Sequence, residues 1–310
     1  MNAVTVLLGY AIVLSWLAPQ LLSGRLTAGV APRLTVAGWL TCVATAVLAW
    51  VSALTILVVA AAHSIITHTA LTFCVETLGI AGAMRLSAEV ATVLVAALLV
   101  ACGAVAVGTG RRVLAGLLAV RRHNRAHAEA VRIVGRSAGP DGVVLIADER
   151  PTAYCVAARG RDTIVVTTSA LGLLDTGELA AVIAHERAHL RGRHHHIVAV
   201  LTALAAALPR LPLLREAERT VPGLLEMCAD DAAVRRHGPA ALVASLVTLA
   251  GHRPLPVTAL AAAGTAVTAR VQRLLQPTAQ SRCNPRAVSL TLACGATLAA
   301  PLLAFTLCTL

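Results

Sequence analysis

The sequence predicts a mostly α-helical membrane protein, with four transmembrane helices and an α+β cytoplasmic domain inserted between the third and the fourth. Three observations support this fold class. The 310 residues are 57% hydrophobic with a mean hydropathy of +0.78, which is too apolar for one soluble domain. Four long apolar runs contain no charged residue. Short β-branched segments lie between the third and fourth runs, as expected for a small sheet.

Each apolar run is long enough to cross the roughly 30 Å hydrocarbon core of a bilayer as a helix. The first run lacks a basic start and an A-x-A exit, so we expect an uncleaved span there rather than a signal peptide. The predicted spans are Val4–Leu22, Val36–Ala62, Val90–Gly110 and Ala287–Leu310. They divide the chain into a three-helix membrane region (1–110), an inserted domain (111–283) and a last transmembrane helix (284–310).

The arginines indicate how the predicted helices are oriented. All 26 basic residues are arginine, and the net charge is +11. The loop after the first span holds Arg25 and Arg33, the loop after the second holds one arginine and two acids, and an arginine cluster over 111–125 follows the third. Because cytoplasmic segments carry the excess of arginine, we expect the N-terminus outside and the inserted domain in the cytoplasm. This multi-pass arrangement in the cell membrane makes the lipid bilayer the expected partner of the basic segments, with no direct nucleic-acid binding.

The inserted domain is expected to open with a helix over Val113–Val134. Three short strands follow: Val143–Ile146, Ala153–Ala158 and Thr163–Thr168. The apolar stretch Ile197–Leu208 is too short for a further span, so we expect a buried or membrane-grazing helix there. The eight cysteines include no C-x-x-C pair, which argues against a disulfide framework and against a thiolate metal site.

After the last predicted strand, the sequence predicts a helix that carries the motif H-E-x-x-H. Asp175, with Glu178 three residues later, is typical of a helix start, and Gly192 is typical of a helix end. The motif, His185–His189, lies in the last turns of this helix. Its two histidines are four residues apart, so they lie one turn apart on the same face.

This spacing indicates a zinc site. The imidazoles of His185 and His189 can both reach one metal ion, and Zn²⁺ is the ion that this motif predicts. Glu186, adjacent to the first ligand, can then accept a proton from a water molecule that the metal activates. Catalytic zinc requires three protein ligands and one open position, so a third ligand must come from elsewhere in the chain.

Two residues compete for the third position. His195, together with Gly192, completes the pattern H-E-x-x-H-x-x-G-x-x-H, in which the last histidine binds the metal. Glu226 is the alternative, on a helix that we expect to begin near Pro222 and to end at Gly238. Asp230 lies one turn after Glu226, where it can orient a ligand imidazole from behind.

If Glu226 is the third ligand, the histidines after Gly192 and the carboxylate of Asp231 have simpler interpretations. His194, His195 and His196 together are consistent with a polar cap at the end of the motif helix. Asp231 is expected to be a solvated carboxylate. His123, His127, His237 and His252 have no spacing that singles them out as ligands.

The H-E-x-x-H helix, followed by E-x-x-A-D at Glu226–Asp230 on a second helix, resembles the gluzincin arrangement of membrane zinc peptidases. Within that group the chain resembles the BlaR/MecR-type integral-membrane zinc metallopeptidases and, more distantly, the HtpX-like peptidases. Three further segments occur in the expected order: Ala153-Tyr154, Leu171–Glu178 and Ala269–Leu275. Three spans before the cytoplasmic domain and one after it also match the BlaR/MecR plan. The chain departs from that plan because no penicillin-binding sensor domain follows the fourth span.

The resemblance implies a membrane-bound zinc metalloendopeptidase. It favours Glu226 over His195 as the third ligand beside His185 and His189, with Glu186 as the catalytic base and Asp230 behind the ligands. An edge strand of the small sheet would pair with the extended substrate. The implied substrate is a cytosolic protein, for example a BlaI-type transcriptional repressor in a signalling pathway. The alternatives are an HtpX-like quality-control protease and a non-enzymatic signalling protein whose zinc is structural.

Overall fold

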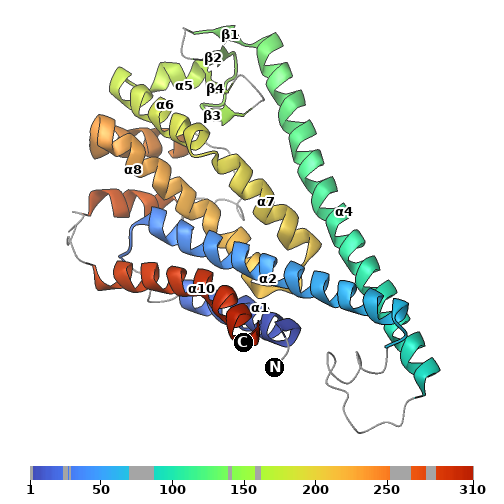
Figure 1. Ribbon diagram of the computed structural model, residues 1–310. Coiled ribbons are helices and arrows are strands. Elements are labelled where there is room, and N and C mark those ends of the chain that lie inside the picture. The colour runs from blue at the N-terminus through green and yellow to red at the C-terminus, as the bar shows by residue number, and fades with distance from the viewer. Residues whose placement is uncertain are drawn as a thin grey trace. The chain divides into compact units, whose positions relative to one another are not determined.

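A computed structural model gives the fold (Figure 1). It describes residues 3–23, 27, 29–69, 87–138, 142–157, 162–251, 267–276 and 284–309. The chain divides into two compact units. The first unit comprises Met1–Ala115, Ala203–Glu218 and Cys283–Leu310. The second comprises Gly116–Thr202 and Arg219–Arg282, and it contains every residue of the predicted site.

Three apolar helices pack together in the first unit: α1 (Ala3–Leu22), α2 (Pro32–Ile66) and α10 (Pro285–Thr309). Small residues allow the helices to approach closely; a Cβ atom added at Gly38 of α2 would lie 3.1 Å from Leu290 of α10. The Tyr10 hydroxyl of α1 donates a hydrogen bond to the Thr297 carbonyl of α10, at 2.7 Å. This hydrogen bond satisfies the Tyr10 hydroxyl and joins the first helix of the bundle to the last.

Within the described residues, three helices are long and apolar enough to cross a membrane: Val4–Leu22, Pro32–Ile66 and Glu89–Val134. These helices contain the first three predicted spans. The fourth predicted run is helical in α10, but its crossing and the orientation of the chain stay predictions. The loop between the second and third spans falls largely outside the described residues.

The third span and the expected helix over Val113–Val134 form one continuous helix, α4 (Ala88–Val134). No proline separates the two segments. Gly103, Gly108 and Gly110 are tolerated because the backbone hydrogen bonds of a membrane helix are all formed within the helix. The predicted limit between membrane region and domain, at 110, therefore lies inside α4.

The second unit contains a four-stranded sheet of order β1-β2-β4-β3. Its strands are β1 (Arg136–Ser137), β2 (Val143–Ile146), β3 (Ala153–Val156) and β4 (Thr163–Thr167). β2 and β4 are parallel, whereas β1 and β3 are antiparallel to their neighbours. β2 has its predicted bounds, and the other two predicted strands end one or two residues early. β4 ends at Thr167 because its side chain caps α5 (Thr168–Leu173) by accepting a hydrogen bond from the amide of Ala170.

Both faces of β4 are covered by helices, so the strand is buried along its whole length. Val165 packs with Ala128 and Val131 of α4 on one face. Ile164 and Val166 pack on the other face, where the neighbours include residues of α5 and of α6 (Thr176–Arg191). This continuous apolar strand fixes α6 against the sheet and so positions the motif helix.

The ends of α6 agree with the sequence prediction. The Asp175 side chain accepts a hydrogen bond from the amide of Glu178, and the Glu178 carboxylate accepts one from the amide of Asp175. Gly192 forms the C-cap. The next helix, α7 (His194–Ala207), has 14 residues and a length of about 21 Å, which is too short to cross a bilayer, as expected.

The helix that carries Glu226 is longer than predicted. α8 extends over Pro212–Gly251, so it begins ten residues before Pro222, and the expected start near Pro222 is wrong. The turns before Pro222 are held by a buried apolar face that includes Leu213 and Ala217, which offsets the backbone hydrogen bond that proline cannot donate. At Gly238, with φ of 78°, the helical conformation is interrupted as predicted.

Alanines bring α6 and α8 close together. Ala181 and Ala184 of α6 form a buried cluster with Ala233 and Leu242 of α8. Leu274, from the helical segment 267–275, packs against the same cluster. Because the side chains at this contact are small, α6 and α8 lie close enough for their polar residues to come into contact beside the alanine cluster.

Candidate active site

The two motif histidines and Glu226 converge on one point. On α6, the Nε2 atoms of His185 and His189 are 3.1 Å apart. Glu226 of α8 presents one carboxylate oxygen to each, at 3.4 Å from His185 Nε2 and 3.4 Å from His189 Nε2. Among the described residues, these three form the group that could hold a metal ion.

The spacing and chemistry of this group fit zinc. Tetrahedral Zn²⁺ binds nitrogen and oxygen at about 2.0–2.1 Å, which separates neighbouring ligand atoms by roughly 3.4 Å. The observed separations of 3.1, 3.4 and 3.4 Å lie close to that value. Two imidazoles and one carboxylate also form a donor set typical of catalytic zinc with one open position.

His195, the competing third ligand, is not part of this group. It is the second residue of α7 and lines a separate cavity together with His196. The histidine that reaches the group is His194, whose Nδ1 lies 3.0 Å from His189 Nδ1. Sequence reasoning treated His194 only as part of a polar cap, so it missed this contact.

Gly192 makes room for the His194 imidazole. A Cβ atom at this position would lie 2.3 Å from His194 Nε2, well inside van der Waals contact. The backbone of Gly192 has φ of −76° and ψ of −5°, which any residue can adopt. The close approach of His194, rather than backbone conformation, therefore explains why glycine suits this C-cap.

Asp230 lies directly beside the first motif histidine. It is fully buried, and its Oδ1 atom is 3.0 Å from His185 Nδ1. Burial alone would raise the pKa of Asp230, but the hydrogen bonds from Arg270 and the close His185 imidazole lower the pKa to about 2. The carboxylate is therefore ionised and can hold the imidazole with Nε2 directed to the metal position.

Arg270 is a site residue to which sequence reasoning gave no role. Its guanidinium donates two hydrogen bonds to Asp230, Nε to Oδ2 at 2.8 Å and Nη2 to Oδ1 at 2.5 Å. Its Nη1 atom lies 3.2 Å from Glu226 Oε2. One arginine thus holds both carboxylates on the polar face of α8.

Asp231 is not a simple solvated carboxylate, and that expectation is wrong. Arg273 donates a hydrogen bond to it, and both side chains are largely shielded from solvent. Arg270 and Arg273 are three residues apart on one helical face and pair with two successive aspartates. The arginine spacing on 267–275, together with Asp230-Asp231, was the available signal for both ion pairs.

Glu186 lies on α6 beside the sheet. Burial raises the pKa of its carboxyl group, and the Cys155 thiol donates a hydrogen bond to it. Burial also raises the pKa of Cys155, which keeps the thiol protonated as a donor. Cys155 belongs to β3, whose only partner among the described strands is β4, so this edge strand passes directly beside Glu186.

The two motif imidazoles differ in their affinity for protons. Burial opposes protonation of His185, but contacts with Asp230 and Glu226 raise its pKa to about 9. Burial, together with the neighbouring His185, lowers the pKa of His189 to about 4. A metal ion at this position therefore has to displace a proton from His185, which couples metal affinity to pH.

Residues 117–237 match the sequence profile of Peptidase family M48, over about two fifths of the chain. A Protease HtpX homolog from Acidiphilium cryptum (strain JF-5) is 42% identical over 73 residues. That alignment covers 22% of this chain and 24% of the relative, so the chain matches about a quarter of the relative's length. No solved structure matches the chain. These matches, together with the apolar helices and the geometry of the site, support a membrane metallopeptidase of the M48 type.

Proposed function

We propose that this chain is a membrane-bound zinc metalloendopeptidase. The convergence of His185, His189 and Glu226 at the spacing of zinc ligands is the observation that carries the proposal. The match of the same segment to Peptidase family M48 supports it. Zn²⁺ held by these three side chains would act as a Lewis acid that acidifies water and polarises the scissile carbonyl.

Glu186 is the general base in this proposal. Its carboxylate accepts the proton of the attacking water and passes it to the leaving amine nitrogen. Burial favours its protonated form, so the carboxyl group retains the proton until the amine leaves. The Cys155 thiol restrains the rotation of this carboxylate from the side of the sheet.

The outer edge of β3, which pairs with no other strand among the described residues, is the proposed binding site for the substrate backbone. An extended peptide can add to an exposed strand edge through main-chain hydrogen bonds, which are independent of side-chain identity. β3 contains Cys155, next to Glu186, so a peptide on this edge would pass in front of the catalytic base. Binding of this kind suits a protease with several protein substrates.

A functional assay on the purified full chain tests the proposal. We expect about one zinc ion per chain and cleavage of an unfolded protein such as casein. A chelator should abolish cleavage, and added Zn²⁺ should restore it. A stoichiometric metal content without cleavage would favour the alternative of a structural zinc in a non-enzymatic protein. That alternative depended on a closed site with His195 as a fourth ligand, and the described residues do not bring His195 into the group.

Two substrate classes fit the proposed enzyme. The likeness to a Protease HtpX homolog supports a quality-control protease of the membrane. The resemblance to BlaR/MecR-type peptidases supports cleavage of a cytosolic repressor in a signalling pathway. Proteomics of cells that express the wild type or Glu186→Gln distinguishes them. Broad accumulation of membrane proteins in the variant supports the first class, whereas accumulation of a single DNA-binding repressor supports the second.

A further inference from the structure

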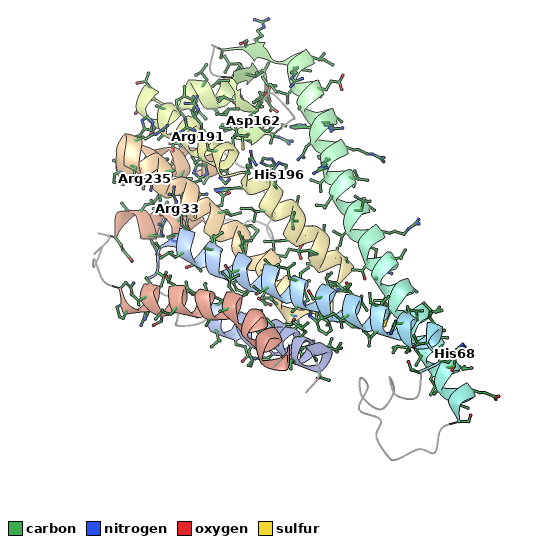
Figure 2. All side chains as sticks on the ribbon, in the orientation of Figure 1. Arg33, His68, Asp162, Arg191, His196 and Arg235 are labelled. Atoms are coloured by element: carbon green, nitrogen blue, oxygen red, sulfur yellow. The ribbon has the colours of Figure 1, made fainter. Side chains whose placement is uncertain are left out.

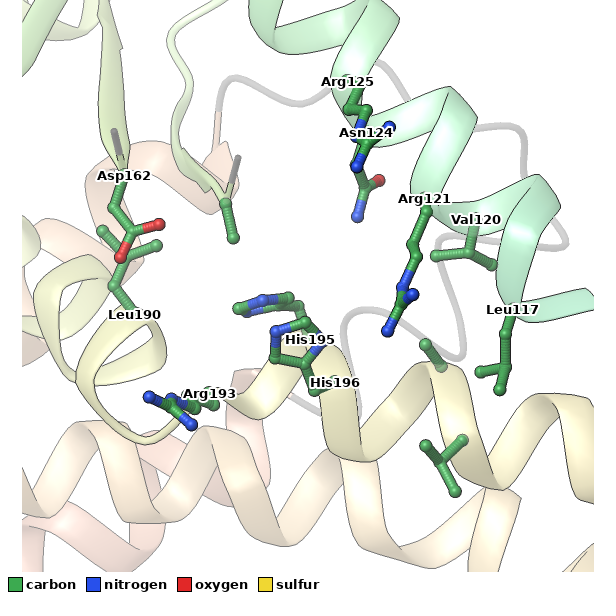
Figure 3. A pocket seen from close by; sticks show the side chains of 13 residues that line it. Leu117, Val120, Arg121, Asn124, Arg125, Asp162, Leu190, Arg193, His195 and His196 are labelled. Carbon is green, nitrogen blue, oxygen red and sulfur yellow. The ribbon is translucent and has the colours of Figure 1, made fainter. Parts of the chain in front are cut away.

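A cavity of about 650 Å³ lies within the second unit, where α4 passes the start of α7 (Figure 3). Arg121 and Arg125 line it from α4, and His195 and His196 line the opposite wall. The positions of His196 and Asp162, two of the lining residues, can be followed in Figure 2. None of the three proposed zinc ligands lines this cavity. It is therefore distinct from the site already described.

The cavity is electropositive. Three arginines line it, Arg121, Arg125 and Arg193, against one acid, Asp162. All three arginines are exposed, and within the part of the chain that the structure describes their guanidinium groups form no ion pair or hydrogen bond with the protein. The buried Nδ1 atom of His195 likewise has no hydrogen-bond partner among the described residues. Guanidinium groups that are open to solvent and line the same cavity attract an anion.

One end of the cavity is apolar, whereas the other end carries charge. Leu117 and Val120 lie at the apolar end, Asp162 lies at the other end together with Leu190, and Arg125 lies between the two ends (Figure 3). Ala199 of α7 adds to the apolar lining. Along α4, the charge-free run that ends at residue 110 precedes Leu117 by seven residues, or about 10 Å. The apolar end thus lies on the side of α4 that leads toward its membrane-spanning segment.

We propose that this cavity binds the headgroup of an anionic phospholipid. The phosphate contacts Arg121, Arg125 and His195, and the first acyl carbons lie against Leu117 and Val120. A free phosphate ion would leave the apolar end unfilled. An acidic peptide has no need for an apolar end that leads toward the membrane. The polarity gradient therefore favours a lipid, whose head and tail have the same order as the lining.

The lipid site is linked to the candidate metal centre through the chain. His195 directly follows His194, and the His194 imidazole contacts His189. A headgroup bound between α4 and the first turn of α7 holds that turn in place. Lipid binding itself does not depend on the proposed peptidase activity, so the two proposals can fail separately.

Native mass spectrometry of the full chain tests the proposal. The chain is released from nanodiscs containing equal amounts of phosphatidylglycerol and phosphatidylcholine with the same acyl chains. We expect the wild type to retain phosphatidylglycerol selectively. Arg121→Ala/Arg125→Ala should lose this selectivity by about tenfold or more, because two charge contacts are removed. Arg122→Ala/Arg132→Ala is the matched control, since it removes two exposed charges from α4 outside the cavity.

A second variant protects the test against misfolding. Ala199→Leu adds apolar volume to the cavity lining without changing any charge, and it should also reduce retention of phosphatidylglycerol. Equal loss in the control pair, or unchanged retention in both cavity variants, would overturn the proposal. Displacement of the bound lipid by millimolar inorganic phosphate would show a simple anion site instead. Displacement by a poly-glutamate peptide would show an acidic-peptide site, which also contradicts the proposal.

Discussion

Arg270 forms two hydrogen bonds with Asp230, at 2.8 and 2.5 Å, although the two residues are forty positions apart in the sequence. The same guanidinium reaches Glu226 at 3.2 Å. Arg270 thus neutralises two carboxylates, one of which contacts His185 and the other of which is the proposed third zinc ligand. The metal centre therefore depends on the helical segment 267–275 as well as on α6 and α8.

Replacement of Arg270 by methionine should weaken zinc binding and destabilise the fold. Asp230 would remain as a buried charge that has lost its guanidinium partner and keeps only the contact with His185, and the loss of one partner of a buried pair typically costs about 3 kcal/mol or more. Loss of this support behind His185 and Glu226 should lower zinc affinity by about 10- to 100-fold. Zinc titration against a chromophoric chelator, combined with thermal unfolding, measures both effects.

Arg273→Met is the matched control, because it removes an arginine one turn away that pairs with Asp231 instead. This more exposed pair should cost about 1 kcal/mol or less of stability and leave zinc affinity unchanged. Equal effects of the two variants on zinc affinity would contradict the role given to Arg270.

Gly192→Ala should weaken zinc binding without touching a ligand. The new methyl group would overlap the His194 imidazole and displace it from His189. A ligand histidine that loses a contact to its other ring nitrogen typically loses about tenfold in affinity. His194→Ala should give a similar loss in the same chelator titration.

Gly172→Ala in α5 serves as the control, since a Cβ atom there meets no neighbouring atom within 4 Å. It should bind zinc as the wild type does. Wild-type zinc affinity in both Gly192→Ala and His194→Ala would show that the contact between the two imidazoles has no role in metal binding.

The sequence predicted those features that depend on residues close to one another in the chain. The reciprocal cap of Asp175 and Glu178 and the bounds of β2 depend on contacts within one element. Arg270 and Cys155 could not be found in the same way, because their roles arise from packing between distant segments. Pro222 misled the prediction, since a proline that favours a helix start was accommodated inside α8 by tertiary packing.

The choice of third ligand separates Glu226 from His195. Glu226→Ala removes one of three ligands, so zinc should bind far more weakly and proteolysis should be lost. His195→Ala should retain both, because this side chain lines the separate cavity. Metal content of the two purified variants, by elemental analysis, checks the assignment. Full zinc in Glu226→Ala with loss in His195→Ala would reverse it.

The predicted orientation can be tested with reporter fusions. The arginine excess over 111–125 places this segment in the cytoplasm, whereas the preceding loop carries little positive charge. A reporter fused after Arg125 should behave as cytoplasmic, and one fused near Glu76 as external. A cytoplasmic signal near Glu76 would show that the number of spans before the domain is wrong.

Substitution of Glu186 by glutamine tests the proposed mechanism most directly. The change preserves the shape of the side chain and all three proposed zinc ligands, but it removes the group that accepts the proton. Zinc content and casein cleavage are measured side by side on the purified wild type and variant. We predict full zinc content and a loss of cleavage of about 100-fold or more. Cleavage at the wild-type rate by the zinc-loaded variant would contradict the mechanism.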